Sequence, residues 1–223
     1  MAELIPSEVQ LAAREVAGLI GDPHALMVQL GVADAVPAIS SGQPLPPIQR
    51  LRDVTALRDF LHRYQSQILY PFELPAIVQA FAFTQQNQGR ELLELDRELV
   101  RNPIWKELTS ASVQVGRSHL RRLRPLRDHR LAQRYLQAVE DGHACGWHTI
   151  VYGVILGVYS LPLRQGLISY ARQTLGGFIH ASKRSVSLSE EGAAELLEEL
   201  SRTAPAAMES ALASQAGKLV PVT

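Results

Sequence analysis

The chain has 223 residues, of which 46% are hydrophobic and 6% aromatic, a balance typical of a globular protein that packs mainly with aliphatic side chains. Lysine plus arginine and aspartate plus glutamate both number 22, so the zero net charge gives no global attraction to nucleic acid or to an anionic membrane. A single cysteine excludes an internal disulfide and fits a reducing compartment, and the N-terminus lacks the basic and apolar regions of a secretory signal. We therefore expect a cytoplasmic protein that neither binds nucleic acid nor spans a membrane.

Helical signals run along the whole chain, and no segment shows the alternation typical of a β-strand. Near the N-terminus, Ser7 begins a capping box and Gly21 is a natural helix end. Asp22 and Pro23 then begin a second helix as its N-cap and first residue. Four prolines within residues 37–47 predict a loop, which is either functional or an ordinary solvated connector.

The rest of the chain predicts further helices from the same capping, proline and periodicity signals. We expect them near residues 53–69, 75–87, 90–101, 103–125, 128–140, 146–159, 162–184, 190–202 and 205–215. Ser189 is the expected N-cap of a glutamate-rich helix, and residues 216–223 are expected to form a flexible C-terminal tail. Because no motif repeats at a fixed period, we predict one all-α domain over residues 1–223, an irregular bundle of about ten helices.

The helix expected to end near Pro125 has an apolar face and a basic face. The apolar face combines large and small residues: Leu108, Ser112, Val115, Gly116, His119, Leu120 and Leu123. On the opposite face Arg117, Arg121 and Arg124 follow one another at i, i+4 and i+7, and we call these three residues the arginine stripe. Small residues let a neighbouring backbone come close, so we expect a central helix with the stripe at the surface.

Seven arginines lie between Arg117 and Arg134 against a single acid, Asp128. A nucleic-acid site would add interleaved aromatic side chains or a recognisable reading motif, and this stretch has neither. We interpret the stripe as a solvated face, as a partner of the six glutamates in the last 35 residues, or as a protein-docking surface. Binding of RNA is a further alternative, which a steep loss of binding with salt would support.

Three residues that can bind soft metal ions, His143, Cys145 and His148, lie within one short segment. A structural zinc site normally needs four such ligands, so we expect no stable metal site on the isolated chain. A Cys145 nucleophile activated by His143 or His148 is the alternative from the enzyme class, but no orienting Asn or Asp is identifiable. The simpler interpretation is a buried thiol beside a hydrogen-bonded histidine.

No charged residue occurs over residues 144–163, a stretch long enough to span a bilayer. Its glycine, histidine and proline residues, and the lack of a second apolar span, favour instead a core helix that is buried on all sides. Gly146, Gly153 and Gly157 fall on one face of this helix, where a neighbouring helix can press close.

Four segments resemble, in the correct order, motifs of one known family. ELTSASVQVGRSHLRRL resembles the family's RxxSxQMGxSLLRL helix, and GHACGWHTIVYGVILGVYSLPLRQGLISYA resembles its HxxVVYGxxxxxLGLPLxxALxAYL segment. IHASKRSVSLSEEGAAELLEEL is similar to its VSAAVRLVPLGQTxGQxLLxxL, and DVTALRDFLHRYQSQILYPFELPAIVQAF fits its helix pair before an acidic-Leu-Pro turn. The family is urease accessory protein F (UreF), and the resemblance covers about residues 53–210.

The resemblance implies a set of partner-contacting residues, to which we add the arginine stripe. The family-matched residues are Ser112, Gln114, Gly116, His148, Tyr152 and Arg184. What the resemblance implies is an all-α homodimer, not itself an enzyme, that assists nickel insertion into the urease apoprotein. Such a protein would bridge a scaffold accessory protein and a nickel-delivering GTPase and regulate GTP hydrolysis. Nickel would be handled by the assembled complex, with no cofactor held stably by this chain.

Two family motifs are not recognisable in this sequence. In place of the glycine- and serine-rich LPVGGFSYSxGLE the chain has PAISSGQPLPPIQRL, and it ends in SQAGKLVPVT where the family has HExxxxRLFRS. Because both motifs belong to partner-contacting parts of the family, a helical interaction protein outside urease maturation is the alternative.

Overall fold

The computed structural model describes residues 51–101 and 109–216, and within these ranges every regular element is a helix. The prediction of an all-α fold is confirmed for this part of the chain. The expected N-terminal helices, the loop at 37–47 and, apart from Ala216, the tail at 216–223 lie outside the described residues. In chain order the elements are α4 (Val54–Tyr64), the π-helical segment η2 (Gln65–Glu73), α5 (Leu74–Gln85), α6 (Gly89–Arg101), α8 (Thr109–Arg122), α9 (Arg130–Glu140), α10 (His148–Val158), α11 (Leu163–Val186), α12 (Glu190–Ser201) and α13 (Ala204–Ala216).

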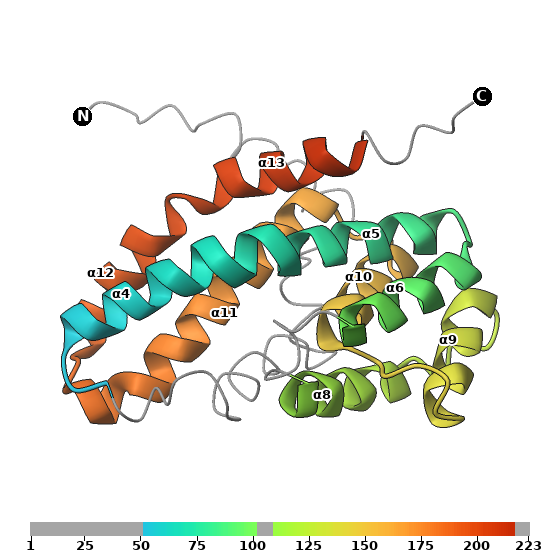
Figure 1. Cartoon of the computed structure of the whole chain (residues 1–223), viewed down its shortest axis with the longest axis horizontal. Helices are drawn as coiled ribbons and strands as arrows, with labels where there is room; N and C mark the ends of the chain where they lie inside the picture. The colour runs from blue at the N-terminus through green and yellow to red at the C-terminus, as the bar shows by residue number, and fades with distance from the viewer. Residues whose placement is uncertain (1–50, 102–108, 217–223) are drawn as a thin grey trace, which may run out of the picture.

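Helices α4, η2 and α5 form one continuous rod across the molecule (Figure 1). Separate helices were expected near 53–69 and 75–87; α4 and α5 lie there, with Pro75 in the first turn of α5, but η2 joins them into one helix. In η2 the backbone takes a wider π-helical register, in which the N–H of Leu74 bonds to the carbonyl of Leu69. This register accommodates Pro71, which has no N–H to donate, without ending the helix. The expected count of about ten separate helices is not supported.

Local caps set the ends of several helices. The Asp53 side chain accepts a hydrogen bond from the N–H of Ala56 at 2.8 Å and begins α4. The hydroxyl of Ser189 accepts one from the N–H of Gly192 at 3.1 Å, which confirms the predicted N-cap of α12. Ser187, with a φ of 51°, ends α11 in the left-handed region.

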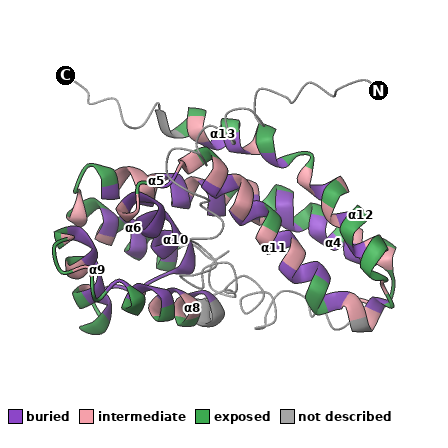
Figure 2. Cartoon of the chain, turned by 180° about the vertical axis from the view of Figure 1, so that it is seen from behind, coloured by how far each residue is buried: buried purple, intermediate pink, exposed green. Residues whose placement is uncertain are grey.

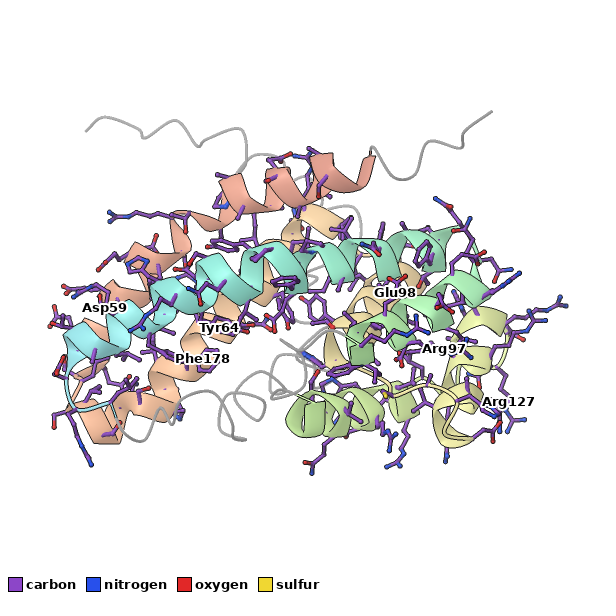
Figure 3. The ribbon with its side chains drawn as sticks, in the orientation of Figure 1. Asp59, Tyr64, Arg97, Glu98, Arg127 and Phe178 are labelled. Atoms are coloured by element: carbon purple, nitrogen blue, oxygen red, sulfur yellow. The ribbon has the colours of Figure 1, made fainter. Side chains whose placement is uncertain are left out.

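The rod joins two groups of helices, one at each end of the molecule (Figure 1). Helices α11 and α12 pack against α4, and α13 lies along η2 and α5. Helices α6, α8, α9 and α10 gather at the other end, with α10 against α5. At the first end the ring of Phe178 meets Tyr64 edge-on, with ring centroids 4.7 Å apart (Figure 3). We call these the α11–α12 end and the α8–α9 end.

Helix α10 is the central helix, and every residue from His148 to Gly157 is buried (Figure 2). A Cβ on Gly153 would lie 2.6 Å from the carbonyl oxygen of Ile77, and one on Gly157 would lie 2.7 Å from a side chain of α5. The predicted close approach is therefore confirmed for these two glycines. Gly146 does not share their face, because it precedes the helix with a φ of 77°. In the described ranges no helix has the length and apolar character needed to cross a membrane.

Candidate functional site

Helix α8 has the buried face and the basic face that the sequence predicted. The buried face carries Ser112, Gly116, His119, Leu120 and, just after the helix, Leu123. Val115 is half-buried, and Leu108 lies outside the described residues. On the basic face Arg121 and Arg124 are exposed, whereas Arg117 is half-buried. The stripe is therefore not uniformly at the surface as expected.

Small residues on α8 let the loop before α10 approach the helix closely. A Cβ on Gly116 would overlap the carbonyl oxygen of Gly146 and lie 2.7 Å from the backbone nitrogen of His148. Beside it the N–H of His148 donates to the hydroxyl of Ser112 at 3.1 Å. Ser112 and Gly116 are buried in this contact, where they position the loop, and their expected contact with a partner stays a prediction.

His148 and Tyr152, also expected at a partner contact, lie in the core, where the Tyr152 hydroxyl donates to the carbonyl of Gly166 at 3.0 Å. The His148 ring stacks on Tyr170 with centroids 5.8 Å apart, and neither ring nitrogen has a hydrogen-bond partner among the described residues. A hydrogen-bonded histidine was expected, but His148 packs against aromatic rings. Burial and, to a smaller extent, neighbouring His119 lower the pKa of His148 to about 3, so the ring is neutral at physiological pH.

The stripe lines a groove between α8 and α9 with a volume of about 530 Å³. Its lining residues are Arg117, Arg121, Arg124, Leu136, Val139 and Glu140. Arg117 donates through Nε to the carbonyl of Cys145 at 2.9 Å, and Arg124 forms an ion pair with Glu140 of α9. Arg121 makes no ion pair with any residue that the structure describes. Arg117 is therefore partly structural, whereas Arg121 is open to a partner.

The C-terminal glutamates, proposed from the sequence as internal partners of the stripe, pair with other cations. The pairs are Arg58–Glu199 and Arg172–Glu198, each at 3.1 Å, together with Arg164–Glu209 and Lys183–Glu190. Three of these pairs involve α12, which lies at the opposite end of the molecule from the stripe (Figure 1). For these glutamates the internal-pairing interpretation is wrong. Of the remaining family-matched residues, Gln114 is exposed on α8, and the side chain of Arg184 lies outside the described part.

The three metal candidates do not form one ligand set. His143 is exposed, Cys145 is half-buried and His148 is fully buried, and residues 51–101 and 109–216 contain no group of three His, Cys, Asp or Glu that could hold a metal ion. Burial, followed by the charge of Asp96, raises the pKa of the Cys145 thiol, and the opposing effect of Arg117 is smaller. A catalytic thiol needs a lowered pKa, so this environment does not favour a nucleophile.

Asp96 of α6 is a buried carboxylate that was not among the candidates from the sequence, and it holds the loop before α10. It accepts hydrogen bonds from the N–H groups of Cys145 and Gly146 at 2.6 and 2.9 Å. It also accepts one from the hydroxyl of Tyr135 at 2.7 Å, and its carbonyl accepts one from the Trp147 indole at 3.2 Å. The Asp96 carboxylate thereby joins α6, α9 and the loop before α10, whose Cys145 carbonyl accepts the hydrogen bond from Arg117.

A second buried carboxylate, Glu73, lies in η2. It accepts a hydrogen bond from the Tyr64 hydroxyl at 2.7 Å and interacts in the same way with Tyr170. Burial raises the pKa of Glu73 to about 7, although both tyrosine hydrogen bonds act to lower it. Because Tyr170 stacks on His148, this carboxylate belongs to a buried polar cluster that joins the rod to α11 and α10.

Comparison with known proteins places the chain in one family. A search of curated proteins gives no match. The UreF family model matches residues 51–201, which is more than half of the 223 residues. The matched range contains the arginine groove and both buried carboxylates. The chain belongs to the UreF family.

Proposed function

We propose that this protein is a urease accessory protein that binds a scaffold accessory protein and a nickel-delivering GTPase and modulates GTP hydrolysis by that GTPase. Membership of the UreF family supports a role in urease maturation in general. The observation that carries the finer proposal is the arginine groove of α8 and α9, in which Arg121 is exposed and makes no ion pair within the described ranges. In this proposal the protein is a cytoplasmic homodimer, and nickel is the cargo of the assembled complex.

The chemistry of the groove fits a regulator of a partner's nucleotide. An added guanidinium near the phosphates stabilises the charge that develops during phosphoryl transfer. The sequence has no phosphate-binding GxxxxGK[ST] loop, so in this proposal the partner carries out the hydrolysis. Arg121 is the residue of the stripe with the most donors available for such a contact, because Arg117 and Arg124 are engaged within the chain.

The test is urease activation in cells that lack this protein. The wild-type chain is expected to restore urease activity and to co-purify with the GTPase and the scaffold, and the double variant Arg121→Glu, Arg124→Glu is expected to do both poorly. Arg52→Glu with Arg63→Glu is the matched control, since both arginines are exposed, one just before α4 and the other in its last turn. Full urease activity in cells without the protein would contradict the proposal and favour a role outside urease maturation.

A further inference from the structure

The groove between α8 and α9 has a basic wall and an apolar floor. Arg117 and Arg121 lie on α8 and Arg124 in the turn after it, so the wall extends over about 10 Å at the helical rise per residue. The floor consists of Leu136 and Val139 of α9, which are 5% and 6% exposed. A ligand of this groove therefore needs negative charge along one side and an apolar surface next to it.

A carboxylate already occupies one end of the wall. Glu140 pairs with Arg124 across the groove, so the molecule itself shows which functional group the wall binds. Arg117 uses its Nε for the carbonyl of Cys145, which leaves its terminal nitrogens as donors. Arg124 contacts Glu140 through one terminal nitrogen only, and Arg121 makes no ion pair in the described ranges, so all three guanidiniums have donors left for further carboxylates.

The lining of the groove favours a protein ligand over a nucleic acid. No aromatic side chain is among its lining residues, so a base would have nothing to stack on. A helix with acidic residues at i, i+4 and i+7 repeats the spacing of the stripe, and two helices packed side by side bring such rows together.

We propose that an acidic helix of a partner protein docks in this groove, with its carboxylates on the arginine stripe, and that Glu140 competes with it for Arg124. This inference rests on the function proposed above and names the chemistry of one partner. Further exposed arginines at the same end would steer an acidic partner toward the groove. They are Arg127, which is labelled in Figure 3, with Arg130 and Arg134.

The experiment measures binding of a fluorescent helical peptide to the full chain. The peptide carries glutamates at i, i+4 and i+7 beside a row of leucines, and a matched peptide has glutamines in their place. We expect the glutamine peptide to bind at least about 10-fold more weakly, and binding of the glutamate peptide to weaken with salt. Arg121→Glu should weaken binding about 5-fold, and Glu140→Gln should tighten it about 3-fold because the competitor is removed. The Arg52→Glu, Arg63→Glu control should bind as the wild type does.

Tightening by Glu140→Gln is the decisive result, because a merely structural Glu140 would give unchanged or weaker binding. Equal binding of both peptides, no binding of either, or no tightening in Glu140→Gln overturns the proposal. Binding of oligouridine RNA would also overturn the proposal, if the wild type retains the RNA and Arg121→Glu abolishes that retention without changing peptide binding. Thermal melting of each variant shows that binding was measured on folded protein.

This experiment and the urease test can fail separately. If the peptide results hold but urease matures fully without the chain, the proposed function fails and the acidic-helix site stands. If the chain is required for urease but the glutamate peptide behaves like the glutamine peptide, the groove assignment alone fails.

Discussion

Both ends of the molecule contain ion pairs, but they differ in how many of their cations are left without an acid. At the α11–α12 end, acidic residues pair with cations of neighbouring helices, as Glu199 does with Arg58. At the α8–α9 end arginines outnumber acids, and Arg121 is exposed without an ion pair in the described structure. A charge that is neutralised inside the chain offers little to a partner, whereas an unpaired arginine is a common contact residue. This difference is the reason why we propose that a partner binds at the α8–α9 end.

The interiors of the two ends differ as well. The α11–α12 end is held by apolar and aromatic contacts, such as Phe60 and Tyr64 against Phe178. The α8–α9 end adds to its apolar core a set of hydrogen bonds that converge on Asp96. Apolar contacts are distributed over many atoms, so one substitution removes few of them. Removal of a buried acceptor, in contrast, leaves several donors unsatisfied at once. The α8–α9 end should therefore be more sensitive to a single change.

The largest expected effect tests that difference directly. Asp96→Ala leaves the hydroxyl of Tyr135 and the N–H groups of Cys145 and Gly146 without their acceptor. We expect the free energy of unfolding in urea to fall by about 3–5 kcal/mol. Asp59→Ala, at an exposed acid of α4 (Figure 3), is the control and should change it by less than about 0.5 kcal/mol. Similar losses in the two variants would remove the contrast between the ends.

Gly153→Leu tests the contact of α10 with the rod, where the two ends meet. The new side chain would enter the space next to the carbonyl of Ile77, and we expect a destabilisation of about 3 kcal/mol in thermal melting. Gly89→Ala is the matched control, because a Cβ there meets nothing within 4 Å. Melting of Gly153→Leu at the wild-type temperature would show that α10 is not packed as tightly as described.

Glu73→Gln tests a buried carboxylate whose charged form is disfavoured by burial. The pKa of Glu73 is raised in the folded chain to about 7 from an ordinary 4.5, so its contribution to stability is fully present below about pH 4.5 and is lost as the pH rises through 7. The variant has no such proton to lose. Above pH 7 its free energy of unfolding should therefore exceed that of the wild type by up to about 3 kcal/mol.

The control for this prediction is Tyr64→Phe, which removes a hydrogen bond that lowers the pKa of Glu73. The pH-dependent loss of stability should then move to higher pH. A difference between Glu73→Gln and the wild type that is the same at all pH values between 4 and 8 would contradict the assignment.

The smallest expected effect is at the α11–α12 end. The side chains of Arg58 and Glu199 are 39% and 42% exposed, so solvent screens their attraction. A double-mutant cycle with Arg58→Ala and Glu199→Ala should give a coupling energy of about 0.5 kcal/mol or less. A coupling above about 2 kcal/mol would mean that charge pairing, and not the apolar interior, holds this end together.

Most helices could be predicted because their signals are local. Ser189 caps α12 by its own side chain, and that signal needs no knowledge of the rest of the chain. The continuous rod could not be predicted, because the π-helical register of η2 depends on distant contacts. Gln65, for example, donates to the carbonyl of Leu200 at 2.9 Å. Pro71 is a helix-breaking signal in the sequence, and only the folded chain shows that it is tolerated.

The candidate site was predictable in outline but not in its internal contacts. Helical periodicity gave the basic face of α8, whereas the bond from Arg117 to the carbonyl of Cys145 requires a loop that Asp96 positions. Asp96 itself left a signal, since it lies between Leu92 and Leu99 on the apolar face of α6. The groups that donate hydrogen bonds to Asp96 could not be predicted from the sequence, because they come from segments distant in the chain.

The rod has a consequence for cooperativity. Because α4 contributes to the interior of one end and α5 to that of the other, neither end can unfold without exposing part of a helix that the other end also uses. We therefore expect a single unfolding unit rather than two independent ones. A ligand held in the α8–α9 groove would then slow amide hydrogen exchange in α4, far from the site where it binds. Exchange that slows at the α8–α9 end and not in α4 would show that the ends open separately.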